Sequence, residues 1–260
     1  MVEPQFQRAH DGLTDDEVLD ALHTRYLARR GWLRSVQLRE AVDLDGPIPW
    51  LTYPAIDFLA GLSRPTWSVF EYGAGSSTLW WEKRVARLVS VEHDAAWAEQ
   101  VRQSLKGGSA DVLTAPSGAE EEPSAAADVE AFFALGLEPV LTSNEGHNAR
   151  SGLHWEPYRG YASMIGCYPK GAFDVVVVDG MARSLTAWMA SRWVKADGLI
   201  VFDNSDRETY RPGYQLLQEA GFARIDFWGL GAVNPYEWCT SVFIRSLAVL
   251  THPSGDRSGG

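Results

Sequence analysis

Segments with the pattern of β-strands alternate with segments with the pattern of α-helices between residues 67 and 246, and this alternation limits the fold more than any other feature. Short apolar runs such as 173–180 (FDVVVVDG) and 198–204 (GLIVFDN) are separated by segments whose apolar residues recur at helical spacing. Parallel strands joined by helices form right-handed crossovers, so helices cover both faces of one sheet. The sequence therefore predicts an α/β fold with a doubly wound, mostly parallel sheet.

Seven strands are expected in this sheet. The last two, 223–229 and 239–246, form a closing pair that supplies an antiparallel edge strand. Ahead of the sheet, helices are predicted over 15–30 and 53–63, with Thr14 as the N-cap of the first. The other predicted strands are 67–73, 87–94 and 110–115, and the other predicted helices are 76–84, 95–105, 184–194 and 208–221.

The length of 260 residues suits one domain with additions. We expect an N-terminal helical extension over 1–66, the α/β domain over 67–250 and a disordered tail over 251–260. Residues 115–157 interrupt the alternation, with a start rich in Gly, Pro, Glu and Ala and an end rich in Gly and Asn. A connection of this length is either a lid-like insertion on the ligand side of the sheet or a flexible surface loop.

The composition limits the classes of partner that the protein is expected to bind. The net charge is -11 and no run is rich in Lys or Arg, which disfavours nucleic acids and anionic membranes. The first residues lack an apolar signal core, and no run approaches the roughly 20 apolar residues of a membrane helix. We therefore expect a soluble cytoplasmic protein. Cys167 and Cys239 stand far apart, without the spacing of a disulfide framework or a zinc site.

A buried strand runs into an acid and two glycines in the segment 68–81 (SVFEYGAGSSTLWW). Gly73 and Gly75 allow the backbone to turn sharply and approach a ligand, and the N–H groups of Ser76 and Ser77 follow at the start of a helix. A nucleotide phosphate would also suit such a loop. However, Glu71 would repel a pyrophosphate, and the third glycine of the dinucleotide motif is replaced by Thr78. The loop therefore favours a cationic ligand.

The second strand ends in another acid, Glu92, 21 residues after Glu71. An acid at this position accepts hydrogen bonds from the ribose hydroxyls of a nucleoside. A nucleoside that carries a cationic amino-acid tail is S-adenosylmethionine. The two acids together therefore indicate S-adenosylmethionine as the cofactor.

The segments VFEYGAGSST and VSVEH resemble the motifs of the class I, Rossmann-like S-adenosylmethionine-dependent methyltransferases. The alternation over 67–246 is similar to their fold. The resemblance implies a methyltransferase domain over 67–250, in which the Gly-rich loop holds the methionine part and the acid after the second strand holds the ribose. The residues implied are Glu71, Gly73, Gly75, Ser76, Ser77 and Glu92, with His93 beside the adenosine and Asp179 at the rim of the cofactor crevice.

A second group of polar residues follows the fourth and fifth strands. Asp179 ends one strand, and Asp203 and Asn204 end the next. Adjacent strands lie roughly 4.8 Å apart, so these side chains are expected to converge. Carboxylate and amide oxygens are ligands for Mg²⁺ or another divalent metal. The sequence therefore predicts a metal and catalytic site formed by Asp179, Asp203 and Asn204.

The segments VVVVDG and LIVFDNS also resemble the metal-dependent catechol and caffeoyl-CoA O-methyltransferases, which implies Mg²⁺ on the same three residues. Those enzymes carry a Lys shortly after the first Asp as general base. Here Arg183 is the nearby cation, and it keeps its proton at ordinary pH. His147, His154 and Asp206 are alternative bases, and the residues do not decide among them.

The remaining candidates concern the acceptor. Trp228, Tyr236 and Trp238 surround a Gly-rich turn that either walls an acceptor pocket or packs structurally, and Arg159 is a candidate partner for an anionic acceptor. The leading helix and exposed aromatic residues offer a surface for a homodimer.

We expect methyl transfer to a small-molecule acceptor, at a hydroxyl oxygen positioned by a divalent metal. The alternatives are metal-free N- or O-methylation of a small molecule or peptide, a nicotinamide-dependent dehydrogenase, and a non-catalytic module that binds the cofactor.

Overall fold

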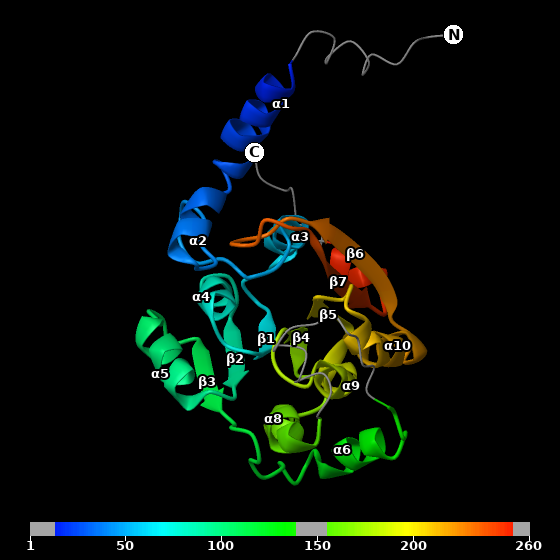
Figure 1. Ribbon diagram of the computed structural model, residues 1–260. Coiled ribbons are helices and arrows are strands. Elements are labelled where there is room, and N and C mark those ends of the chain that lie inside the picture. Colours follow the sequence, from blue (N-terminus) through cyan, green and yellow to red (C-terminus); the bar gives the residue numbers. More distant parts are fainter. Residues whose placement is uncertain (1–13, 139–154, 252–260) are drawn as a thin grey trace, which may run out of the picture.

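The computed structural model describes residues 14–138 and 155–251 of the chain, and its centre is one seven-stranded sheet covered by helices (Figure 1). The strand order is β3-β2-β1-β4-β5-β7-β6. The predicted α/β fold with a Rossmann-like, doubly wound sheet is confirmed. The strands are β1 Ser68–Tyr72, β2 Arg87–Glu92, β3 Ala110–Thr114, β4 Phe173–Val178, β5 Val194–Asp203, β6 Ala223–Gly229 and β7 Trp238–Ile244.

The strand order reverses beside β1, which pairs in parallel with both β2 and β4. Ligands of open parallel sheets bind at this point, beyond the carboxyl ends of the strands. β7 is antiparallel to both of its neighbours, β5 and β6. The antiparallel strand therefore lies one position inside the edge, and β6 is the edge strand.

Two apolar cores lie on opposite faces of the sheet, because alternate residues of a strand point to opposite faces. In β1, Val69 belongs to one core and Phe70 to the other, and both are fully buried. The first face carries α3 Tyr53–Leu62, α4 Ser76–Glu82 and α5 Ala95–Ser104. The second carries α6 Ala126–Phe133, α8 Arg159–Ser163, α9 Arg183–Trp193 and α10 Arg211–Glu219.

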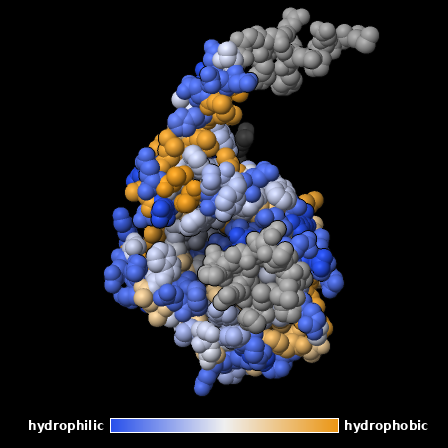
Figure 2. All heavy atoms as spheres, in the orientation of Figure 1, coloured by the Kyte–Doolittle hydropathy of each residue, from blue (hydrophilic) through white to orange (hydrophobic). Residues whose placement is uncertain are grey.

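The N-terminal helices project from this body (Figure 1). α1 Asp15–Ala21 begins at Thr14, whose hydroxyl accepts a hydrogen bond from the N–H of Glu17, so the predicted N-cap is confirmed. The helix continues as a π-helix, η2 Leu22–Leu27, and α2 Trp32–Leu38 follows. Leu19, Leu22 and Tyr26 are exposed, and Figure 2 shows apolar side chains gathered along this projection.

The described part of the 115–157 segment packs against the second face of the sheet. Val129 and Phe132 of α6 are buried there, and the indole N–H of Trp188 donates to the carbonyl of Asp128. Residues 139–154, which include His147 and His154, and residues 252–260 lie outside the described residues. Within the described ranges, no helix is both long enough and apolar enough to cross a bilayer.

Two glycines let the loops after β1 and β4 approach each other closely. Gly73 has a φ of +94°, and a Cβ built there would lie 2.9 Å from the carbonyl oxygen of Asp179. A Cβ on Gly180 would lie 2.9 Å from the backbone nitrogen of Gly73 and 2.1 Å from the hydroxyl of Tyr161. Side chains at these positions are therefore excluded by space, and at Gly73 also by backbone conformation.

We expect Gly73→Ala to lower the free energy of unfolding by about 1–3 kcal/mol from backbone strain alone, with the clash against Asp179 adding to this loss. Gly61→Ala is the matched control, since Gly61 is an exposed helical residue of α3 with open space around it. That control should gain about 0.5–1 kcal/mol. Urea unfolding of both variants measures the difference. Equal stability of Gly73→Ala and the wild type would contradict the close approach of the two loops.

Candidate active site

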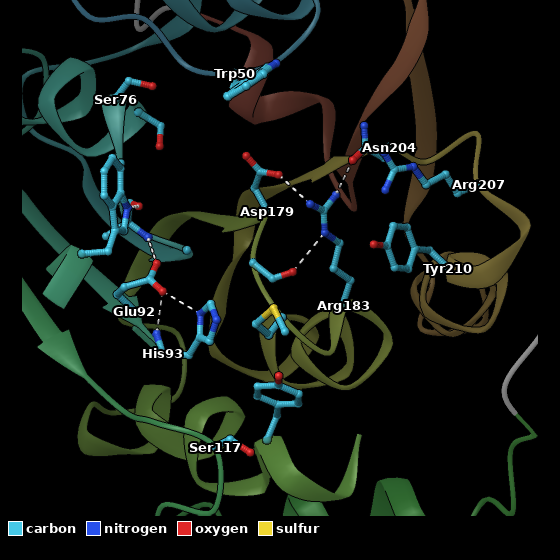
Figure 3. Close-up of a pocket in the computed structure, with 18 of the residues that line it drawn as sticks. Trp50, Ser76, Glu92, His93, Ser117, Asp179, Arg183, Asn204, Arg207 and Tyr210 are labelled. Carbon is cyan, nitrogen blue, oxygen red and sulfur yellow. Dashed lines mark hydrogen bonds and ion pairs between the residues drawn. The ribbon is translucent and has the colours of Figure 1, made fainter. Parts of the chain in front are cut away.

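A cavity of about 830 Å³ lies beyond the carboxyl ends of the central strands (Figure 3). Its volume falls within the range of small-molecule sites. The Gly-rich loop, Glu92 and His93 line one half, and Asp179, Arg183 and Asn204 line the other. The other lining residues are Trp50, Trp97, Ser117, Pro157, Tyr158, Gly180, Met181, Arg207 and Tyr210.

The loop between β1 and α4 contributes Gly73, Gly75, Ser76 and Ser77 to the wall, at the place predicted for them. A Cβ on Gly75 would meet no atom closer than 4.0 Å, the distance to a ring carbon of Trp97. The absent side chain at Gly75 therefore leaves open space on the cavity side of the loop.

Glu71 lies one layer behind this loop, rather than in the cavity wall. Its side chain is fully buried, and its Oε2 accepts hydrogen bonds from the hydroxyls of Thr78 at 2.6 Å and Ser90 at 2.7 Å. The Thr78 hydroxyl also accepts from the N–H of Gly75 at 2.9 Å. Burial raises the pKa of Glu71, and these hydroxyl donors oppose the rise. Glu71 therefore holds the loop through Thr78.

Glu92, at the end of β2, lines the cavity as predicted. Its carboxylate accepts hydrogen bonds from the backbone N–H groups of Ala74, His93 and Asp94, and its Oε1 lies 2.6 Å from Nδ1 of His93. Burial acts to raise the pKa of Glu92, but these hydrogen bonds outweigh it and the pKa is lowered. Glu92 is therefore a fixed negative charge at the cavity wall.

Aromatic residues that sequence reasoning did not assign to the cofactor close this half of the cavity. Trp97 stands on the first turn of α5, and its indole N–H donates to the carbonyl of Ala74 at 2.7 Å. Tyr158 also lines this half, with its ring 6.2 Å from the ring of His93. Trp97 follows an N-cap, Asp94, that the sequence shows plainly, but an exposed Trp on a helix gives no sign of the direction it faces.

Arg183 organises the other half. Its guanidinium donates to the carbonyl oxygens of Gly180 and Asp203, to Oδ1 of Asn204 at 3.2 Å and to Oδ1 of Asp179 at 2.8 Å. The residue is 8% exposed. Buried charges in proteins are normally paired and hydrogen-bonded, and Arg183 is both. The structure thus places this cation among the three residues predicted to bind a metal.

Those three residues do not fit a divalent ion in this arrangement. Oδ1 of Asp203 accepts from the indole of Trp238 and the hydroxyl of Thr240, and Asp203 does not line the cavity. Asp179 and Asn204 each direct an oxygen at Arg183. In the described part of the chain, no group of three or more His, Cys, Asp or Glu side chains could hold a metal. The metal site therefore stays a prediction, and in this arrangement its three residues surround the guanidinium of Arg183.

Two residues close to Arg183 have left-handed backbone conformations. Ala182 has a φ of +50° and Asn204 a φ of +52°. This region is uncommon for residues other than glycine, and alanine does not belong to the types enriched there. Such conformations persist where the surrounding structure fixes them, and they cluster at functional sites. Ala182 directly precedes Arg183, and Oδ1 of Asn204 accepts a hydrogen bond from the Arg183 guanidinium.

Trp50, Arg207 and Tyr210 complete this half, and sequence reasoning missed all three as site residues. Trp50 lies across the cavity from Asp179, and Arg207 and Tyr210 lie beside Asn204 and Arg183 (Figure 3). Arg207 and Tyr210 come from the segment directly after β5, and that adjacency is the signal that the sequence offered.

Other candidates for the acceptor region are elsewhere. Arg159 is ion-paired with Glu121, Glu130 and Glu156 and does not line the cavity. Asp206 accepts a hydrogen bond from the N–H of Cys239, and it is also outside the cavity wall. The aromatic residues Trp228, Tyr236 and Trp238 do not line the cavity either, and Trp238 is buried against Asp203.

No protein-family model matches the chain, and no curated protein is significantly similar to it. Solved structures that resemble it include a methyltransferase from Geobacter sulfurreducens, 14% identical over 94% of this chain and 98% of that chain, with a TM-score of 0.45. Precorrin-6y C5,15-methyltransferase from Geobacter metallireducens is 13% identical over 73% and 86%, with a TM-score of 0.47. Spermidine synthase from Thermotoga maritima is 11% identical over 73% and 56%, with a TM-score of 0.41. Similarity at this level assigns no activity to the chain.

The hydrogen-bond chain from Glu71 to Gly75 gives a test by substitution. Thr78→Val keeps the shape of the side chain but leaves the Gly75 N–H and one position on Glu71 without a partner. A buried polar group left unpaired costs about 1–3 kcal/mol, so we expect a loss of that size in the free energy of unfolding. Thr78→Ser retains the hydroxyl and should keep most of the stability. If the valine variant unfolds at the same urea concentration as the wild type, this chain does not hold the loop.

The raised pKa of Asp179 can be tested through the pH dependence of the free energy of unfolding. Burial raises its pKa from an ordinary 3.8 to about 8, although the charge of Arg183 opposes the rise. Between these two values the folded protein keeps a proton that the unfolded chain has lost. The free energy of unfolding should therefore fall as the pH rises, by up to about 1.4 kcal/mol per pH unit from this group.

Asp179→Asn removes this group, so its stability should decline less steeply between pH 5 and pH 8 than that of the wild type. Urea unfolding at four pH values in this range measures both slopes. Asp197→Asn, which removes a carboxylate from an exposed position of β5, controls for the change in net charge. Parallel curves for the wild type and Asp179→Asn would show that Asp179 is already ionised throughout this range.

Proposed function

We propose that the protein is an S-adenosylmethionine-dependent methyltransferase that acts on a small-molecule acceptor without a divalent metal. The observation that carries the proposal is the arrangement of one cavity. The Gly-rich loop and the fixed carboxylate of Glu92 line one half, and the carboxylate of Asp179 lines the other. The cavity thus joins a nucleoside site to a site for a proton-donating acceptor.

The residues of the first half fit the cofactor. Glu92, held by three backbone N–H groups, would accept hydrogen bonds from the ribose. The loop from Gly73 to Ser77, open where Gly75 lacks a side chain, would hold the methionine part. His93, Trp97 and Tyr158 would enclose the base. When bound, the cofactor supplies an activated methyl group on a positively charged sulfur, and Glu92 supplies negative charge in the same cavity.

Glu71 has a different part in this proposal from the one that the sequence indicated. Glu71 is buried behind the loop, so its carboxyl group would not contact the ligand directly. It fixes Thr78, and Thr78 fixes the Gly75 N–H, so Glu71 keeps the loop in the conformation that leaves room for the cofactor. A direct contact between Glu71 and a cationic ligand is therefore not part of the proposal.

Asp179 is the group that would receive a proton from the acceptor. Its Oδ1 accepts from Arg183, and its Oδ2 has no hydrogen-bond partner among the described residues. A carboxylate fixed on one oxygen and free on the other can orient a hydroxyl or amine of the acceptor and remove its proton. A pKa of about 8 suits a general base near neutral pH.

Arg183 replaces the metal in this proposal. It positions Asp179 and Asn204, and its donors are directed at protein oxygens rather than at an acceptor. The metal-assisted O-methylation expected from the sequence is therefore not retained.

The test begins with the cofactor half of the cavity. We expect S-adenosylhomocysteine, the demethylated cofactor, to bind the wild type in a calorimetric titration. Glu92→Gln should weaken that binding by about 10-fold or more, because a charged hydrogen-bond acceptor is worth about 1.5–3 kcal/mol. Glu99→Gln is the control, since Glu99 is exposed on α5, the helix that follows Glu92 in the chain, and lies outside the cavity wall.

Methyl-labelled S-adenosylmethionine, incubated with the protein and a small-molecule extract, then tests transfer with Mg²⁺ or with EDTA. Equal labelling in both arms is the expected result. Labelling only with Mg²⁺ would restore the metal-dependent mechanism. Failure of S-adenosylhomocysteine to bind, together with tight binding of NADH, would replace the methyltransferase with a dehydrogenase.

A further inference from the structure

A second arginine, Arg207, lines the acceptor half of the cavity and forms no ion pair with any of the described residues. Arg207 stands on the turn after β5, closed by a hydrogen bond from its own N–H to the carbonyl of Asn204. Its side chain is half-buried and reaches toward Asn204 and Arg183, next to Tyr210 (Figure 3). The guanidinium carbon of Arg207 lies 5.9 Å from the centroid of the Tyr210 ring.

The acidic neighbours of Arg207 along the chain are engaged elsewhere. Oδ1 of Asp206 accepts from the N–H of Cys239 at 3.0 Å. Glu208 forms an ion pair with Arg211 at 3.2 Å. The carboxylate of Asp179 is already paired with Arg183. Among the described residues Arg207 thus forms no ion pair, in a protein whose net charge is -11, although its charge does act on Asp179.

Three other partly buried arginines have carboxylate partners, whereas the partly buried Arg64 and Arg84 donate to backbone carbonyls. Arg159 pairs with three glutamates, Arg192 with Asp128 and Arg224 with Asp226. A guanidinium presents a planar set of donors that matches a carboxylate or phosphate. An arginine left unpaired beside a ligand site is therefore suited to an anion that the ligand brings.

The surroundings of Arg207 also indicate how such a ligand would lie. Trp50 and Tyr210 offer aromatic surfaces on this half of the cavity, and Asp179 stands between this half and the Gly-rich loop (Figure 3). An acceptor with its anionic group on Arg207 and its body between the aromatic rings would present its other end to Asp179. The charges of Arg183 and Arg207 both oppose the effect of burial on the pKa of Asp179.

We propose that the acceptor carries an anionic group, a carboxylate or a phosphate, and that Arg207 binds this group while Asp179 receives the reacting hydroxyl or amine. The proposal rests on the proposed function, because it assigns the acceptor to the half of the cavity opposite the cofactor. Arg207 is a specificity-determining residue in this arrangement and does not contact the cofactor.

The test uses the full-length protein saturated with S-adenosylhomocysteine and three probes of similar size: benzoate, phenyl phosphate and the neutral benzamide. We expect saturable binding of at least one anion in a calorimetric titration and at least 10-fold weaker binding of benzamide. Arg207→Gln should weaken the anion by at least 10-fold, and Arg207→Lys should retain part of the affinity. The anion that binds more tightly identifies which group the acceptor carries.

Arg211→Gln is the matched control, because Arg211 lies four residues away, pairs with Glu208 and does not line the cavity. It should bind the anions as the wild type does. Equal binding of benzamide and the anions, binding unchanged in Arg207→Gln, or no saturable binding of either anion would each overturn the proposal. The affinity of each variant for S-adenosylhomocysteine is measured separately. If the wild type does not bind S-adenosylhomocysteine, the proposed function itself is refuted. If the wild type binds S-adenosylhomocysteine but neither anion, only the role of Arg207 is refuted.

Discussion

The hydrogen bonds of one buried guanidinium hold together the two strand ends on which the acceptor half of the cavity depends. Arg183 joins the turn after β4, through Gly180 and Asp179, to the end of β5, through Asp203 and Asn204. A buried charge without partners would cost several kcal/mol, so each of these acceptors is needed where it is. The positions of the strand ends and the position of the cation are therefore determined together, and the cavity wall is rigid on this side.

A second buried network fixes the opposite wall. Glu71 accepts a hydrogen bond from the hydroxyl of Thr78, and that hydroxyl accepts one from the N–H of Gly75. The carboxyl group behind the loop thus fixes the shape of the loop. Gly73 and Gly180 then allow this loop and the turn after β4 to touch. The two halves of the site are thus joined through backbone contact between glycines. A change in either network would alter the distance between the cofactor half and Asp179.

Much of this could be predicted from the sequence, because strand ends in a parallel sheet converge whatever the side chains do. That rule placed Glu92 and Asp179 correctly at the cavity. It could not tell that Glu71 points behind the loop, since alternation along a strand does not say which face is covered. Nor could it show that Arg183 folds back onto Asp179 and Asn204, because the direction of a long side chain is set by its tertiary partners.

The fixed charge of Arg183 determines which other residues of the cavity could take each role in the proposed reaction. A guanidinium keeps its proton at ordinary pH, so Arg183 cannot remove a proton. Four of its five N–H donors already bind protein oxygens, which leaves one for an acceptor. A metal ion in its place could have both assisted proton removal and bound an acceptor by exchanging a ligand for substrate. In the proposed reaction, with the arginine present, the free oxygen of Asp179 would remove the proton. Recognition of charge then requires a second cation, and Arg207 is the arginine of the cavity wall that remains available for it.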